Sequence, residues 1–211
     1  NNSSEAFTRY IDMFMQANYH RLTFLKDEAY QFIQHAAAGF DPEQIIVSFS
    51  GGKDSTVTAD LAIKALSNPS LVHIFGDTTL EFPSTTEYAE RYRNFHPEAI
   101  FQVARNDDQD FYEVCDDIGP PARMMRWCCS MFKTGPITRI INSLYGSEQI
   151  LTFYGIRKFE SVSRSKYNRI EDSADAVKIK QQTVASPIFF WKDIDIWLYI
   201  LAEDIDFNRA Y

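Results

Sequence analysis

Residues 45–66 read IIVSFSGGKDSTVTADLAIKAL, an apolar strand pattern that passes through two glycines into an amphipathic helix pattern. The glycines let the backbone approach an anion closely, because no Cβ intervenes. The first turn of the helix adds free N–H groups and the positive end of the helix dipole. Lys53 adds a positive charge, and two serines add hydroxyl donors. The stretch 50–55 therefore predicts a pocket for phosphate groups.

The spacing of this stretch excludes two common phosphate-binding motifs. A Walker loop needs four residues between its glycines and then Lys-Ser or Lys-Thr, and the dinucleotide fingerprint G-x-G-x-x-G is absent. A surface turn of the same composition is the remaining alternative. Such a turn requires neither the strand before it nor the helix after it, so we favour the phosphate pocket.

Strand and helix patterns alternate along the chain. Strands are predicted at 45–49, 71–75, 99–103 and 149–154, and helices at 55–66, 84–95, 108–118, 136–145 and 193–203. This alternation indicates parallel βαβ units, so we expect an α/β fold with a doubly wound, mostly parallel sheet and helices on both faces. One or two further helices are predicted within residues 1–40, an N-terminal helical extension that precedes the domain at 41–211. Asp193 is the candidate N-cap of the last helix.

Polar residues follow three of the predicted strands. Loop 50–55 follows the first strand, Asp77 and Thr78 follow the second, and Gly155 and Arg157 follow the fourth. In an open α/β sheet, ligands bind beyond the carboxyl ends of the strands. We therefore expect these residues to converge at one edge of the sheet.

Composition is ordinary for a soluble protein, with 45% hydrophobic and 24% charged residues among 211. No apolar run reaches 18 residues and no signal peptide is apparent, so no membrane association is expected. An odd count of three cysteines favours a reducing compartment, and we predict a cytoplasmic protein.

The charge distribution is uneven. The chain has a net charge of −8, which argues against nucleic acid as a general partner. Residues 123–169 nevertheless hold nine lysines and arginines against two glutamates, a net charge of +7. This segment suggests a local anionic ligand, although a solvated basic face is an alternative.

Loop 50–55 resembles the PP-loop of N-type ATP pyrophosphatases, and the wider pattern resembles the phosphoadenosine phosphosulfate (PAPS) reductase family of that superfamily. Within it, the motifs are most similar to those of the ATP pyrophosphatases of DNA phosphorothioation. The resemblance spans residues 45–211 and implies an adenine nucleotide alpha-hydrolase-like fold. It rests on five ordered blocks: residues 50–55; Asp77 and Thr78 with Phe82 and Pro83; Cys128 and Cys129 with Lys133 and Pro136; Gly155, Ile156 and Arg157 with Glu160, Ser161 and Arg164; and Pro187 with Trp191, Asp193 and Trp197.

The resemblance implies that ATP with Mg²⁺, or the sulfonucleotides PAPS or APS, binds at the loop. The implied catalytic residues are Lys53, Asp54, Arg157 and Arg164. Those implied to hold the nucleotide are Ser50, Gly51, Gly52, Lys53, Asp54, Ser55, Asp77, Thr78, Lys133, Gly155 and Arg157. Asp54 and Asp77 are the candidates for Mg²⁺, and the arginines suit phosphate or sulfate because a planar guanidinium can bond two oxygens.

Several of these residues also have structural alternatives. Asp77 could serve as a turn or cap residue, and both arginines could pair with surface carboxylates. Trp191 and Trp197 are expected in the core rather than against a ligand.

In relatives of this kind, adjacent cysteines such as Cys128 and Cys129 supply half the ligands of a 4Fe–4S cluster. A Cys-x-x-Cys pair that supplies the other half lies, in the family pattern, just beyond the position of Tyr211. We therefore expect the natural domain to continue past this residue and to complete the cluster there. Two half-buried thiols without a cofactor are the alternative.

Three functions remain open on this basis. An intact loop favours an ATP pyrophosphatase that activates its substrate by adenylation for sulfur transfer, with DNA and a cysteine desulfurase or another sulfur donor as candidate partners. A PAPS or APS reductase of sulfate assimilation is the second. The third is a non-catalytic nucleotide- or cluster-binding module of a larger complex. A homo-oligomer is a further candidate assembly.

Overall fold

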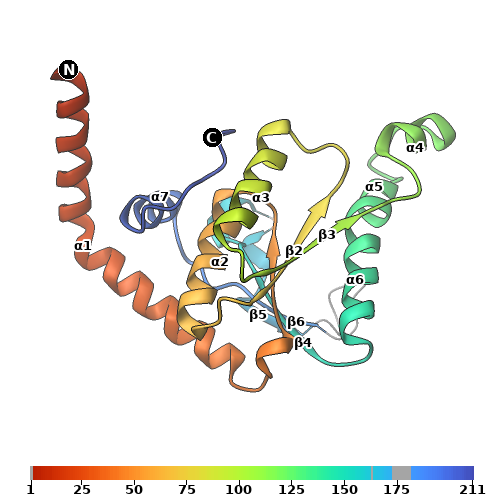
Figure 1. Cartoon of the computed structure of the whole chain (residues 1–211), viewed down its shortest axis with the longest axis horizontal. Helices are drawn as coiled ribbons and strands as arrows, with labels where there is room; N and C mark the ends of the chain where they lie inside the picture. The colour runs from red at the N-terminus through yellow and green to blue at the C-terminus, as the bar shows by residue number, and fades with distance from the viewer. Residues whose placement is uncertain (1, 163, 173–181) are drawn as a thin grey trace.

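The computed structural model describes residues 2–162, 164–172 and 182–211, and its centre is a six-stranded sheet (Figure 1). The strand order is β3-β2-β1-β4-β6-β5, and all neighbours are parallel except β5, which runs antiparallel to β6. Strand β1 therefore lies between β2 and β4 in the middle of the sheet. The bounds are β1 Ile45–Phe49, β2 Val72–Asp77, β3 Ile100–Arg105, β4 Ile150–Tyr154, β5 Ile170–Asp172 and β6 Gln182–Ala185.

Helices connect the parallel strands and flank the sheet (Figure 1). They are α1 Asn2–Ala37, α2 Lys53–Leu66, α3 Pro83–Phe95, α4 Phe111–Ile118, α5 Trp127–Cys129, α6 Gly135–Tyr145 and α7 Asp193–Ala202. Short 3₁₀ turns occur at η1 Pro42–Gln44, η3 Lys158–Glu160 and η4 Arg164–Lys166, and η2 Ser130–Thr134 is a π-helical turn.

The two faces of the sheet bury separate apolar clusters. In β1, Val47 and Phe49 join the larger cluster, which includes residues of α1, α2, α3 and α7. Ile46, which points to the opposite face, joins a smaller cluster with Ile141 of α6. Successive strand side chains alternate between faces, so β1 is covered on both sides, as a continuous apolar strand requires.

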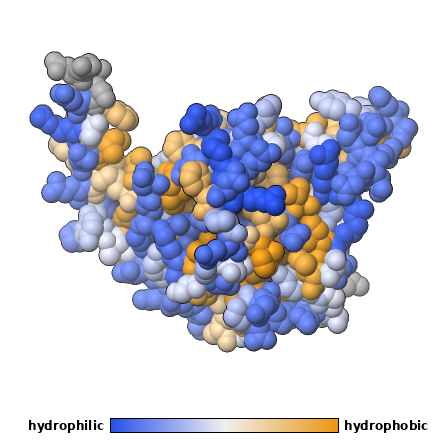
Figure 2. Space-filling view, viewed as in Figure 1, coloured by the Kyte–Doolittle hydropathy of each residue, from blue (hydrophilic) through white to orange (hydrophobic). Residues whose placement is uncertain are grey.

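Helix α1 is a single helix, and it packs on the body from about Phe14 to its end. Ala29 and Ile33 are fully buried, and Arg21 forms a bidentate pair with the buried Asp195 of α7 at 2.7 and 2.8 Å. Its N-terminal end extends away from the sheet (Figure 1), and apolar residues lie on its surface there (Figure 2). Phe7 and Tyr10 are among the exposed apolar side chains of this end. Among the described residues, no helix is both long and apolar enough to cross a bilayer.

Three expectations about elements need correction. Strands β5 and β6 were not predicted. The expected helix at 108–118 begins at Phe111, because Asp110 caps it by accepting from the N–H groups of Tyr112 and Glu113. Lys192 rather than Asp193 is the N-cap of α7, and Asp193 is the first helical residue.

Candidate functional site

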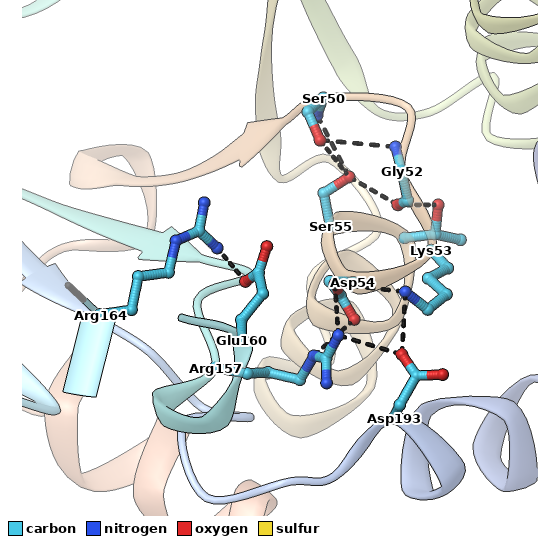
Figure 3. A network of polar contacts seen from close by, with 10 residues as sticks. Ser50, Gly52, Lys53, Asp54, Ser55, Arg157, Glu160, Arg164 and Asp193 are labelled. Carbon is cyan, nitrogen blue, oxygen red and sulfur yellow. Dashed lines mark hydrogen bonds and ion pairs between the residues drawn. The ribbon is translucent and has the colours of Figure 1, made fainter. Parts of the chain in front are cut away.

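Loop 50–55 leaves the carboxyl end of β1 and enters α2 at Lys53, as Figure 3 shows. Gly51 has φ +71°, and a Cβ there would lie 3.1 Å from the methyl group of Thr85. Gly52 is the N-cap of α2 and offers no side-chain cap. This leaves the first turn of α2 with the donor-rich geometry that binds anions.

The two serines brace the loop internally. Ser55 Oγ accepts from the N–H of Ser50 at 3.2 Å and donates to the carbonyl of Gly52 at 2.8 Å (Figure 3). The hydroxyls of the two serines lie 3.1 Å apart. These bonds tie the end of β1 to the first turn of α2, so the loop is preorganised without a ligand.

Four charged side chains form an ion network beside the loop (Figure 3). Arg157 is buried and bonds both carboxylate oxygens of Asp54, with Nε to Oδ1 at 2.9 Å and Nη2 to Oδ2 at 3.2 Å. Asp193 Oδ1 accepts from Arg157 Nη2 at 3.2 Å and lies 3.1 Å from Lys53 Nζ. Lys53 Nζ lies 3.7 Å from Asp54. The two positive charges and the two negative charges of the network thus neutralise one another.

The network also perturbs Asp193. Partial burial raises the pKa of its carboxyl, but the hydrogen bond and charge of Lys53, together with the charge of Arg157, outweigh burial and hold that pKa below its usual value. Asp193 therefore stays ionised at neutral pH and keeps both cations in place.

Gly155 brings the end of β4 against the first turn of α2. A Cβ on Gly155 would lie 2.7 Å from the carbonyl carbon of Asp54 and 2.8 Å from the N atom of Ser55. Only a residue without a side chain fits so close to backbone atoms. This contact places Arg157, two residues later, within reach of Asp54.

Strand β2 extends to Asp77, two residues beyond the predicted end, so Asp77 is its last residue and only Thr78 follows it. Both are engaged in the turn that begins there. Asp77 accepts from the N–H of Thr79 at 2.8 Å and from Arg105 at 3.3 Å. Thr78 donates to Glu81 at 2.9 Å. Within the described residues, neither side chain is bonded to the phosphate loop.

Arg164 and Lys133 also lie outside the ion network. Arg164 pairs with Glu160 and stands apart from Lys53 in Figure 3. Lys133 is exposed on η2. The structure therefore brings Gly155 and Arg157 to the loop, and their roles, like those of the other predicted site residues, remain predictions.

The side chains that could ligate a metal do not form a complete site by themselves in the part of the chain that the structure describes. Cys128 and Cys129 are half-buried on α5, but across the described ranges no group of three or more His, Cys, Asp or Glu side chains is arranged to hold a metal ion. Two thiolates do not complete a cluster that needs four. Both oxygens of Asp54 bond Arg157, and Asp77 bonds Thr79 and Arg105, so neither carboxylate is set up for Mg²⁺ on its own.

The sequence alone did not assign Asp193 or Asn208 to the loop. Asp193 was expected as a helix cap and named in the fifth block of the resemblance, but no contact with the loop was assigned to it. Asn208, whose amide bonds the carbonyl of Gly51, was not singled out. Both lie about 150 residues from the loop along the chain, so no local spacing signals these contacts.

Comparison with known proteins finds similar sequences. The family model described as phosphoadenosine phosphosulfate reductase domain matches residues 44–211. The chain is 34% identical to an uncharacterised protein of Methanocaldococcus jannaschii over 210 residues, which cover all of this chain and 41% of that protein. It is 25% identical to an adenosine 5'-phosphosulfate reductase of Staphylococcus saprophyticus, covering 80% of this chain and 66% of that one. A sulfate adenylyltransferase subunit 2 of Chelativorans sp. is 27% identical, with coverages of 93% and 69%.

Solved structures share the fold. A phosphoadenylyl-sulfate reductase from Candida auris superposes with a TM-score of 0.66 at 16% identity, covering 90% of this chain and 88% of that one. A U34-tRNA thiolase from Methanococcus maripaludis, solved with its 4Fe–4S cluster, gives a TM-score of 0.55 at 14% identity, with coverages of 88% and 65%. The expected PP-loop nucleotide alpha-hydrolase fold is thereby confirmed.

The matched length is partial for each of these sequence relatives. The chain spans about two fifths of the length of two uncharacterised Methanocaldococcus jannaschii proteins, at 41% and 38%. Activity, substrates and partners of a whole protein are accordingly matters for proposal.

Proposed function

This chain belongs to the phosphoadenosine phosphosulfate reductase domain family, and from that premise we propose that it binds an adenine nucleotide at loop 50–55 and acts in sulfur metabolism. One observation carries the proposal. The first turn of α2 follows a Gly-Gly turn at the carboxyl end of the central strand, with Lys53 held beside it by Asp193. An anion-binding helix terminus with a positioned lysine suits a polyphosphate.

The chemistry that we propose is adenylation with ATP. An oxygen of the acceptor attacks the α-phosphorus, the bond from that phosphorus to the bridging oxygen breaks, and pyrophosphate leaves. The acceptor then carries AMP on that oxygen, so a sulfur nucleophile can displace AMP. The intact loop and the likeness to a protein named sulfate adenylyltransferase subunit 2 support this order of events.

Roles for the chain's own residues follow from the geometry. The loop amides and Lys53 stabilise the charge that develops on the leaving pyrophosphate. Arg157 and Asp193 hold Asp54 and Lys53 in place through the ion network. Since neither candidate aspartate is set up for Mg²⁺ by itself, we propose that the metal arrives as the nucleotide's complex. Arg164 is proposed to bind the distal phosphate or acceptor after leaving Glu160.

We also propose a finer assignment, in which the acceptor is a DNA phosphate, as in phosphorothioation, and a cysteine desulfurase or another donor supplies the sulfur. Its support is the basic segment 123–169, in which Arg123, Arg126 and Lys166 are exposed. Charge of this kind favours any polyanion, so a nucleotide alone is the competing ligand.

Reduction of a sulfonucleotide is the second candidate function. The likeness to a protein named adenosine 5'-phosphosulfate reductase favours it, and so does the cysteine pair on α5. A 4Fe–4S cluster would there require two more thiolates than the pair Cys128 and Cys129 supplies.

The test uses the full-length natural protein, purified without oxygen, and assays pyrophosphate release from ATP and Mg²⁺ with DNA or sulfate present. Adenylation predicts release that Lys53→Ala abolishes and that Arg93→Ala, which removes an exposed charge on α3, leaves intact. Tight binding of APS or PAPS without any pyrophosphate release would favour reduction. Absence of binding by ATP, APS and PAPS alike would refute both functions.

A further inference from the structure

The segment 206–211 returns from α7 to the phosphate loop. Asn208 is 3% exposed and donates through Nδ2 to the carbonyl oxygen of Gly51 at 3.1 Å and to Thr85 Oγ1 at 3.0 Å. Close by, the hydroxyl of Tyr88 donates to the backbone carbonyl of Asp206 at 2.9 Å. A residue remote in sequence is thus buried against the backbone of the loop itself.

The orientation of the Asn208 amide is fixed by its partners. Its Oδ1 accepts from the N–H of Ala210 at 2.9 Å. A backbone N–H can only donate and a backbone carbonyl can only accept, so the amide nitrogen must face Gly51. The side chain meets both requirements at once.

Holding the carbonyl of Gly51 has a consequence for the next peptide group. The bond between Gly51 and Gly52 is planar and trans, so its C=O and its N–H point in opposite directions. Fixing the oxygen therefore fixes the direction of the Gly52 N–H, which donates to Ser50 Oγ at 3.4 Å inside the loop. Gly51 has no side chain to restrict its own rotation, so the bond from Asn208 adds a restraint from outside the loop to the one that Ser50 supplies within it.

We propose that Asn208 is a positioning residue of the phosphate loop, which aims the N–H of Gly52 at the bound phosphate by holding the carbonyl of Gly51. The inference rests on the proposed nucleotide site, because the restraint on Gly51 has this function only if a phosphate binds at the loop. Thr85 supports it by accepting the second hydrogen of the amide and by packing its methyl group against Gly51.

The test compares Asn208→Ala and Asn208→Asp with a control, Asn142→Asp, on the exposed face of α6. Calorimetry measures binding of inorganic pyrophosphate and of ATP to the full-length protein. Asn208→Ala is expected to weaken both by about tenfold or more, because a buried carbonyl loses its donor. Asn208→Asp, nearly the same shape, is expected to weaken them further at neutral pH, where a carboxylate faces the carbonyl and repels the ligand.

A pH series separates positioning from general stabilisation. A protonated carboxyl regains an O–H donor for Gly51, so pyrophosphate affinity of Asn208→Asp, relative to Asn142→Asp, should recover as the pH falls. A residue that only stabilises the fold would lower the melting temperature without this recovery. Unchanged affinity in Asn208→Ala, or no recovery in Asn208→Asp, overturns the inference.

Hydrogen exchange at residues 50–55 keeps the test independent of the proposed function. If the natural protein binds neither probe, the proposed function fails, and exchange then decides the inference alone. Faster exchange in Asn208→Ala than in Asn142→Asp, confined to this loop, supports positioning. Equal exchange refutes it. If Asn208→Ala does not fold, Thr85→Val, which removes one acceptor of the amide, takes its place in the same comparison.

Discussion

Replacing Gly155 by alanine tests whether the close contact between β4 and α2 holds the site together. The new Cβ would lie 2.7 to 2.8 Å from backbone atoms of Asp54 and Ser55, whereas ordinary contact begins near 3.4 Å. The end of β4 and the first turn of α2 must therefore separate by about 0.7 Å. Backbone atoms cannot rotate away as a side chain can, so the strain falls on the packing of both elements. A change of this kind costs about 2 kcal/mol of unfolding free energy.

The same displacement acts on the ion network. Arg157 lies two residues beyond Gly155, and its bonds to Asp54 are 2.9 and 3.2 Å long. A separation of this size takes at least one of them past hydrogen-bonding distance. We therefore expect Gly155→Ala to weaken ATP binding by about tenfold in addition to the loss of stability, because Lys53 and Asp54 share the displaced turn.

Urea unfolding and calorimetry with ATP measure the two effects. Gly39→Ala is the matched control, since a Cβ there meets nothing within 4 Å and no left-handed φ is involved. The control should change stability by less than about 0.5 kcal/mol. If Gly155→Ala matches Gly39→Ala in both measurements, the contact does not organise the site and the reasoning is refuted.

Two further predictions concern single charges. Asp54→Asn leaves the buried Arg157 with Asp193 as its remaining carboxylate. Urea unfolding should therefore show a decrease of roughly 2 kcal/mol in the free energy of unfolding. An unchanged urea midpoint would contradict the ion network. His73 is buried between the Leu71 carbonyl and the Tyr92 hydroxyl, and burial lowers its pKa to about 4. Between pH 6.5 and 4 the unfolded state binds a proton at His73 that the folded state does not, so unfolding free energy should fall by roughly 3 kcal/mol as pH drops through that window. Urea titrations of His73→Gln across the same range should show a smaller fall, and equal slopes would rule out this histidine as the cause.

The centre of the fold was predictable because its signals are local. Strand β1 was predicted at its observed bounds, and α2 differs only in beginning two residues earlier, at Lys53. Each has a clean apolar pattern, and the two glycines mark the turn between them. Strands β5 and β6 were missed because three or four residues carry too little pattern. The pairing of β6 with β4, and of β5 with β6, rather than propensity makes them strands.

Only those site residues whose position follows from the order of the strands in the sheet could be predicted. The rule for strand ends brought Gly155 and Arg157 to the loop, since β4 lies beside β1. It could not show that Arg157 would bond Asp54, or that Asp193 would hold Lys53 from the start of a distant helix. Such contacts depend on how α2 and α7 pack, which no spacing in the sequence encodes.

Because loop 50–55 is attached to the central strand β1, local unfolding at the edges of the sheet should affect it little. Strands β3 and β5 are the outer members of the sheet, and each can fray while β1 keeps both of its neighbours. Local loosening at the periphery therefore leaves the glycine turn anchored. Insertions or proteolytic cleavage near β3 or β5 should therefore weaken phosphate binding little. Loss of the pairing between β1 and its two neighbours should weaken it strongly, because the loop is attached to β1.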